Sequence, residues 1–165
     1  MCIRDSIYTC SRETGGKEEM QQPSIPGFQK GASGAILLTA SATTGWLDWI
    51  HGELWLFPHG LLRIPLNLAT TYLHGTGPTV DKKQRPQRSF DQTTLQTLLV
   101  SPKNVWVPRE SLQKAYLHHG IITDRLRLII GDHRSVKFLW FPQDGARQLL
   151  QSTLAEWLGS ELIID

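Results

Sequence analysis

The sequence predicts a mainly β protein in which one carboxy-terminal α-helix caps a bent antiparallel sheet or barrel. Residues 125–130 and 135–140 alternate apolar and polar side chains, as half-buried strands do. After Phe141-Pro142 the apolar period lengthens from two to about 3.6 residues, which indicates an amphipathic helix over about 143–158. The stripe consists of Ala146, Leu149, Leu150, Thr153, Leu154, Trp157 and Leu158. Gly159 then favours the end of the helix.

Length and composition predict one ordinary domain with a tail. The chain has 165 residues, of which 40% are hydrophobic and 19% charged, and its six tryptophans supply apolar area for a sizeable core. The net charge of +2 is too small to indicate a nucleic-acid partner, which usually needs a concentrated basic patch. We therefore expect no specific nucleic-acid partner and no small-molecule cofactor.

The amino-terminal residues are set apart from the domain. We interpret residues 1–6 (MCIRDS) as a translated sequencing adapter, so Met1 is not expected to be the true start. Cys10 is then the only cysteine to interpret, which suggests no disulfide framework and fits a cytoplasmic location. Residues 7–34 are rich in Gly and Pro, and we expect a flexible tail. The apolar run 35–40 is far short of the ~20 residues that a membrane span needs.

The first strand is expected at 35–41, followed by a connection at 43–51 that carries large apolar residues. These residues are Trp46, Trp49 and Ile50. Tryptophan is usually largely buried, so the pattern favours packing in the core. The alternative is that they form an interaction surface for a partner.

The clearest hairpin lies at 52–66. Two apolar runs flank Pro58-His59-Gly60, where proline presets the turn and glycine tolerates positive φ. Both runs have apolar residues at consecutive positions, so we place the pair in the middle of the sheet or under a cover on its second face. Pro65 is expected to end the second strand or to mark an edge.

Residues 74–91 form a long basic loop, and a loop of this length is usually functional or disordered. Its cations Lys82, Lys83, Arg85 and Arg88 are candidates for contact with anions or lipid headgroups, although a solvated loop is the ordinary interpretation. The leucine spacing then predicts a short helix over 92–100. We expect further strands at 105–108 and 111–118, and a tail at 160–165.

This order of strands followed by one helix resembles the pleckstrin-homology-like (PH-like) superfold, in particular bacterial PH-like and GRAM-like domains. The resemblance rests on the stretch GELWLFPHGLL at 52–62, on VPRESL at 107–112, and on the two strands before the final helix. It covers about residues 35–159. Members that bind phosphoinositides use basic residues around the first strand connection, whereas residues 42–51 contain no lysine or arginine.

No catalytic, cofactor-binding or metal-ligating set is identified in the sequence. The six histidines lack the spacing of a zinc site, and we interpret them as turn or surface residues. The carboxylates Asp48, Glu53, Glu110 and Asp124 are taken as solvated.

We therefore expect a non-enzymatic interaction module that contacts a protein partner or itself. The alternative is a domain that binds anionic membrane surfaces weakly, as a peripheral protein. A third is an enzyme without a recognisable motif.

Overall fold

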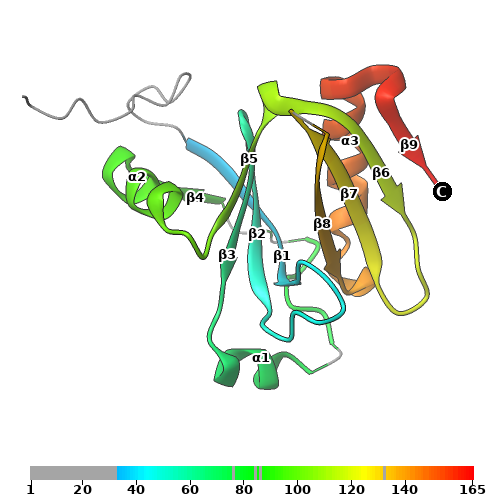
Figure 1. The fold of residues 1–165 in the computed structure, drawn as a ribbon. Coiled ribbons are helices and arrows are strands. Elements are labelled where there is room, and N and C mark those ends of the chain that lie inside the picture. Colours follow the sequence, from blue (N-terminus) through cyan, green and yellow to red (C-terminus); the bar gives the residue numbers. More distant parts are fainter. Residues whose placement is uncertain (1–32, 76, 84, 86, 132) are drawn as a thin grey trace, which may run out of the picture.

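The computed structural model describes residues 33–165, apart from 76, 84, 86 and 132, and the protein is mainly β (Figure 1). Its strands form two sheets, with the orders β4-β1-β2-β3-β5 and β8-β7-β6-β9. The predicted fold class, antiparallel strands with one carboxy-terminal helix, is confirmed. The two sheets do not close into a barrel. Residues 1–6 and most of the predicted tail 7–34 lie outside the described residues.

The first sheet contains β1 (Ser33–Ala42), β2 (Gly52–Phe57), β3 (Gly60–Pro65), β4 (Gln87–Ser89) and β5 (Val105–Pro108). All its neighbouring strands run antiparallel. The predicted hairpin is β2 and β3, which lie in the middle of the sheet and end at Pro65. A Cβ atom on Gly60 would lie 2.4 Å from the carbonyl oxygen of Val107, so β5 can approach this closely only beside a glycine.

The second sheet contains β6 (Leu112–His118), β7 (Asp124–Ile130), β8 (Arg134–Trp140) and β9 (Leu162–Ile164). The pairs β6–β7 and β7–β8 are antiparallel, whereas β9 pairs with β6 in parallel. The prediction of a tail at 160–165 is therefore wrong. A strand replaces the tail because its three residues find hydrogen-bonding partners on the edge of β6, which no local pattern reveals.

The main core lies between the two sheets and α3 (Ala146–Leu158), which lies behind the second sheet in Figure 1. Leu150 and Leu154 are fully buried there, as the helical stripe predicts. Trp157 packs against the edge of this core, and the guanidinium of Arg109 lies over its ring at 5.4 Å. Short 3₁₀ turns flank the helix at η2 (Pro142–Asp144) and η3 (Gly159–Glu161), and a third, η1 (Arg109–Ser111), precedes β6.

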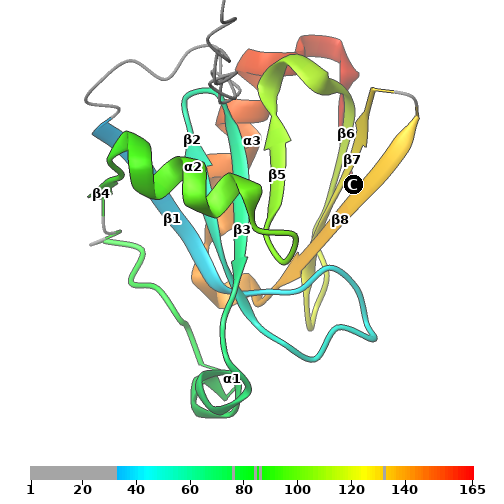
Figure 2. The same cartoon turned by 60° about the vertical axis from the view of Figure 1, so that its left-hand side comes forward.

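A second core covers the other face of the first sheet. α2 (Gln92–Val100) lies across this sheet in Figure 2 and buries Leu95 against it. Trp55 and Phe57 of β2 both contact the ring of Phe90, which precedes the helix. The sheet is thus covered on both faces, which explains the consecutive apolar residues of the hairpin.

The segment that follows α1 (Leu68–His74) is tied to the main core by the carboxylate of Asp144, which is fully buried. Asp144 accepts hydrogen bonds from the hydroxyls of Thr39 and Ser41, and from the backbone N–H and hydroxyl of Thr79 at 2.6 and 2.7 Å. These contacts join residues that lie 65 to 105 positions apart in the chain. They fix part of the predicted long loop against β1, and β4 then pairs with β1.

Candidate interaction surface

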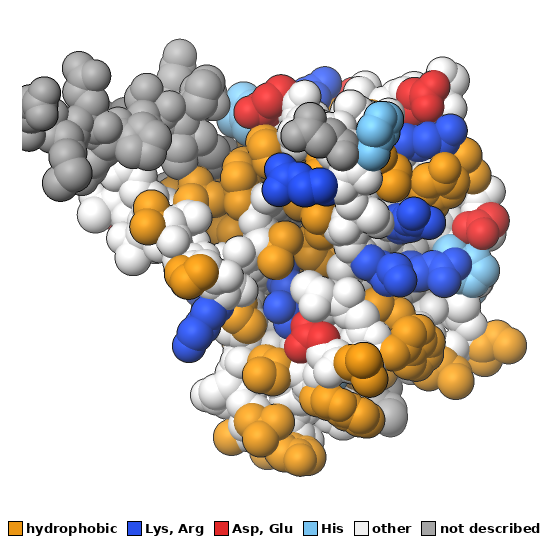
Figure 3. Space-filling view, viewed as in Figure 1, with side chains coloured by type: hydrophobic (Ala, Val, Ile, Leu, Met, Phe, Trp, Pro, Cys, Tyr) orange, Lys and Arg blue, Asp and Glu red, His pale blue; other side chains and the backbone are white. Residues whose placement is uncertain are grey.

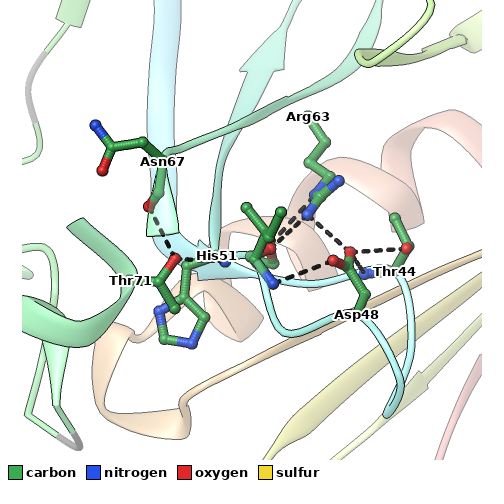
Figure 4. Close-up of polar contacts among 8 residues, drawn as sticks. Thr44, Asp48, His51, Arg63, Asn67 and Thr71 are labelled. Atoms are coloured by element: carbon green, nitrogen blue, oxygen red, sulfur yellow. Dashed lines mark hydrogen bonds and ion pairs between the residues drawn. The ribbon is translucent and has the colours of Figure 1, made fainter. Parts of the chain in front are cut away.

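The β1–β2 connection, residues 43–51, is held in place by the carboxylate of Asp48 (Figure 4). Asp48 accepts hydrogen bonds from the backbone N–H and the hydroxyl of Thr44, both at 2.9 Å, and from the backbone N–H of Ile50 at 3.2 Å. These bonds give the connection the form of a closed turn around one side chain.

Arg63 of β3 completes this arrangement from inside the fold. Arg63 is 5% exposed, and its guanidinium pairs with Asp48 at 2.8 Å and donates to the carbonyl oxygens of Ala42 and Ile50. Burial raises the pKa of Asp48, but the Thr44 hydrogen bonds and the charge of Arg63 outweigh it, and the net pKa lies below the ordinary value. The inner side of the connection is therefore rigid and charged, whereas the side chains at its exposed tip are apolar.

The tip points its large side chains into solvent. Trp46, Leu47 and Trp49 are 69%, 91% and 77% exposed, and Ile50 is also exposed. The expectation that Trp46, Trp49 and Ile50 pack in the core is therefore wrong, and these residues lie on the surface. The physical reason is local: Asp48 and Arg63 occupy the inner side of the connection, so its neighbours face outward.

Helix α1 adds apolar side chains next to this tip. Its amino terminus is capped by Asn67, whose side-chain oxygen accepts from the N–H of Thr70 at 2.7 Å. No residue of α1 is buried, and Leu68, Tyr72 and Leu73 are exposed. No apolar periodicity in the sequence predicts this helix.

The β6–β7 turn, residues 119–123, brings a third apolar segment to the same end of the molecule. Ile121 and Ile122 are exposed there. The turn is closed by His119, whose Nδ1 lies 2.7 Å from the carboxylate of Asp124. An open hollow of about 410 Å³ lies between this turn and Trp46, and Arg125 is among the residues that line it.

These three segments come together along one edge of the protein, which we name the apolar end (Figure 3). The figures place the connection, α1 and the turn at that edge although they are far apart in sequence (Figures 1 and 2). The apolar end consists of Trp46, Leu47, Trp49, Ile50, Leu68, Tyr72, Leu73, Ile121 and Ile122. An exposed cluster of this kind is typical of a docking site.

Exposed cations lie on the outer face of the second sheet, beside the apolar end. Arg125 follows the β6–β7 turn, and Arg127 lies directly opposite Lys137 on the neighbouring strand. We name Arg125, Arg127 and Lys137 the cation row. In the part of the chain that the structure describes, none of the three forms an ion pair. Like charges that face each other across neighbouring strands are unfavourable.

The basic loop predicted from the sequence divides into two kinds of cation. Lys82 and Lys83 are exposed, as a headgroup contact needs. The guanidinium of Arg85 instead donates to the carbonyl oxygens of Leu37, Leu38 and Asp144, and that of Arg88 lies over the ring of Trp55 at 5.6 Å. Arg85 therefore serves the fold, and the structure does not bring it to the cation row.

The carboxylates and histidines also differ from the sequence interpretation. Asp124 is only 1% exposed, and Asp48 is paired with Arg63, so neither is a solvated carboxylate. Asp124 is buried and Asp48 is half-buried because each closes a turn through hydrogen bonds. Among residues 33–165 with the gaps given above, no group of three or more His, Cys, Asp or Glu side chains is placed to hold a metal ion. His51 and His74, however, lie against each other.

The comparisons with known proteins leave the family open. Neither the protein-family models nor the curated proteins contain a match to this chain. The PH-like resemblance therefore stays a prediction. Over the described residues, no helix combines the length and the apolar character needed to cross a bilayer.

Proposed function

We propose that this chain is a non-enzymatic, PH-like interaction module that docks on an anionic membrane surface through its apolar end. The observation that carries the proposal is the adjacency of two surfaces, the apolar end and the cation row, at one end of the protein (Figure 3). The proposal places the module at the cytoplasmic leaflet, because anionic lipids give that leaflet its negative potential.

Apolar insertion supplies the first part of the binding energy. Burying one large apolar side chain fully contributes about 1.5–3 kcal/mol, and partial insertion of several such residues gives a comparable sum. Trp46 and Trp49 suit this role because indole rings favour the boundary between headgroups and acyl chains. The Asp48–Arg63 pair supports it, since a rigid connection loses little conformational entropy when it docks.

The cation row supplies the second part. Each cation near an anionic surface contributes about 1 kcal/mol. Arg127 and Lys137 gain further, because a phosphate between them relieves their mutual repulsion. This part depends on ionic strength, since salt screens charges over about 8–10 Å.

Docking on a protein partner is the second candidate. The hollow between Trp46 and the β6–β7 turn favours it, because a volume of about 410 Å³ is sufficient for an apolar side chain of a partner or of a second copy. This mode requires neither lipid nor the cation row.

Co-sedimentation with vesicles tests the proposal. We expect binding to vesicles of phosphatidylcholine with phosphatidylglycerol, and about tenfold weaker binding or less to phosphatidylcholine alone. The double variant Trp46→Ala/Trp49→Ala and the triple variant Arg125→Gln/Arg127→Gln/Lys137→Gln should each reduce binding at least tenfold. Circular dichroism checks that each variant remains folded.

Lys82→Gln/Lys83→Gln is the matched control, because it removes exposed cations from the loop instead of the cation row. We expect it to bind as the wild type does. Binding that ignores lipid charge, or that is lost only in this control, contradicts the proposal. A wild type that ignores vesicles but sediments as a Trp46-dependent dimer in ultracentrifugation supports the protein-docking candidate instead.

A further inference from the structure

His51 and His74 meet head to head at the inner side of the apolar end. Their Nδ1 atoms are 3.2 Å apart, whereas the ring centroids are 5.5 Å apart and the ring planes differ by 23°. The difference between these two separations equals the distance from a ring centroid to its Nδ1, counted once for each ring. The two Nδ1 atoms therefore lie on the line between the centroids and point at each other. One Nδ1–H therefore donates to the other Nδ1, which must be unprotonated.

This hydrogen bond is one of the few ties that hold α1. The backbone N–H of His51 donates to the hydroxyl of Thr71 at 3.0 Å (Figure 4), and the N–H of Leu66 donates to the carbonyl oxygen of His51 at 2.8 Å. Each of these contacts runs through His51. α1 has seven residues and buries none of them, so it is too short and too exposed to be stable by itself.

We propose that the His51–His74 hydrogen bond is a proton-dependent latch, which holds α1 on the β1–β2 connection and releases it when both imidazoles are protonated. With one proton between the two Nδ1 atoms, the bond forms whether the pair is neutral or carries one charge. With both rings charged, two N–H groups and two positive charges face each other across 3.2 Å, and the attraction becomes repulsion.

The charged groups around His51 set the direction of the pH response. Burial lowers the pKa of His51, and the neighbouring His74 and Arg63 lower it further, whereas Asp144 and Asp48 raise it; the net pKa lies below 6.5. The folded state thus resists protonation more than the unfolded state does. The stability that the latch contributes is therefore complete above about pH 6.5 and is lost as the pH falls through the lower folded pKa.

The latch regulates the apolar end, and in this respect the inference rests on the proposed function. α1 carries Leu68, Tyr72 and Leu73 of that end, and its release lets them reach a surface independently. Protonation also adds positive charge beside the membrane. We expect binding to anionic vesicles to strengthen about tenfold between pH 7.5 and 5.5.

Amide hydrogen exchange without vesicles tests the latch by itself. Protection factors of residues 68–74 are compared at pH 7.5 and 5.5, with β7 as the internal reference. We expect α1 to lose about tenfold or more of its protection at pH 5.5, while β7 changes little. Equal protection of α1 at the two pH values would overturn the proposal.

Two substitutions of His74 separate the latch from other effects of pH. His74→Phe removes the bond, so α1 should be unprotected at both pH values. His74→Asn keeps an amide that can donate to His51 or accept from it, so α1 should stay protected at both. His133→Asn, at an exposed histidine whose positive φ asparagine tolerates, should leave the wild-type response intact.

Loss of protection at pH 5.5 in His74→Asn, equal to that of the wild type, also overturns the latch. The two proposals fail separately. If α1 loosens at pH 5.5 but the protein does not bind vesicles, the latch is supported and the proposed docking function is contradicted. If the protein binds vesicles in a charge-dependent way but the protection of α1 does not change with pH, the docking function is supported and the latch is contradicted.

Discussion

Arg63 and Asp48 decide how the exposed tryptophans are presented. Arg63 is 5% exposed and needs a partner, because a buried charge without one is strongly destabilising. Asp48 gives Arg63 that partner and at the same time closes the connection through Thr44 and Ile50. The carboxylate of Asp48 thus both neutralises the buried Arg63 and fixes the conformation of the exposed β1–β2 connection.

Replacing Asp48 by Ala should destabilise the fold by about 3 kcal/mol, because Arg63 is then left buried and unpaired. Urea denaturation measures the change, and Glu156→Ala, at an exposed site on α3, is the control that should stay within about 0.5 kcal/mol. The folded pKa of Asp48 is lowered, so its contribution is complete above the ordinary value of 3.8 and declines as the pH falls through the folded value. The difference between wild type and Asp48→Ala should therefore shrink near pH 3; a constant difference would contradict this assignment.

The residues that sequence reasoning missed are those whose partners lie far away in the chain. The high average burial of tryptophan predicts Trp46 and Trp49 inside, but their neighbour Asp48 is the residue that points inward. The donors of Asp144 lie in β1 and in the segment after α1, about 65 to 105 positions away. No spacing in the sequence reveals such a set.

At the scale of elements, α3 and α1 are opposite kinds of helix. α3 buries a continuous stripe, including Leu150 and Leu154, whereas α1 buries nothing. Periodicity therefore predicts α3 and the short α2, but α1 depends on its Asn67 cap and on contacts through His51. β4 and β9 are not predicted for a related reason, since each has only three residues. β4 is a strand because it pairs with the edge of β1, and β9 because it pairs with the edge of β6.

The same substitution in the two helices should have very different costs. Leu154→Ala removes a fully buried side chain from the main core and should lower the free energy of unfolding by about 2–5 kcal/mol. Leu73→Ala, on α1, removes an exposed one and should change it by about 0.5 kcal/mol or less. Urea denaturation of both variants provides the comparison, and similar costs would mean that α3 does not hold the two sheets together.

At the scale of the whole molecule, the two sheets meet beside the apolar end. Thr43, which follows β1, forms a two-way backbone bridge with Leu139 of β8, with both N–O distances at 2.9 Å. This bridge brings the β1–β2 connection close to the β6–β7 turn, about 70 positions later in the chain. The candidate surface is therefore a product of tertiary folding, and the sequence alone predicts only its separate apolar segments.

Because the tryptophans differ in their exposure to water, their fluorescence can report on the environment of the exposed ones. Trp55 and Trp140 are buried and Trp106 and Trp157 are half-buried, whereas Trp46 and Trp49 are exposed, so the two tryptophans of the apolar end should emit at the longest wavelengths. Adding anionic vesicles should shift the emission to shorter wavelengths. In Trp46→Phe/Trp49→Phe, which keeps two apolar rings at the tip, the shift should vanish while sedimentation with vesicles persists. A spectrometer can then follow the arrival of the protein at a surface without any attached dye.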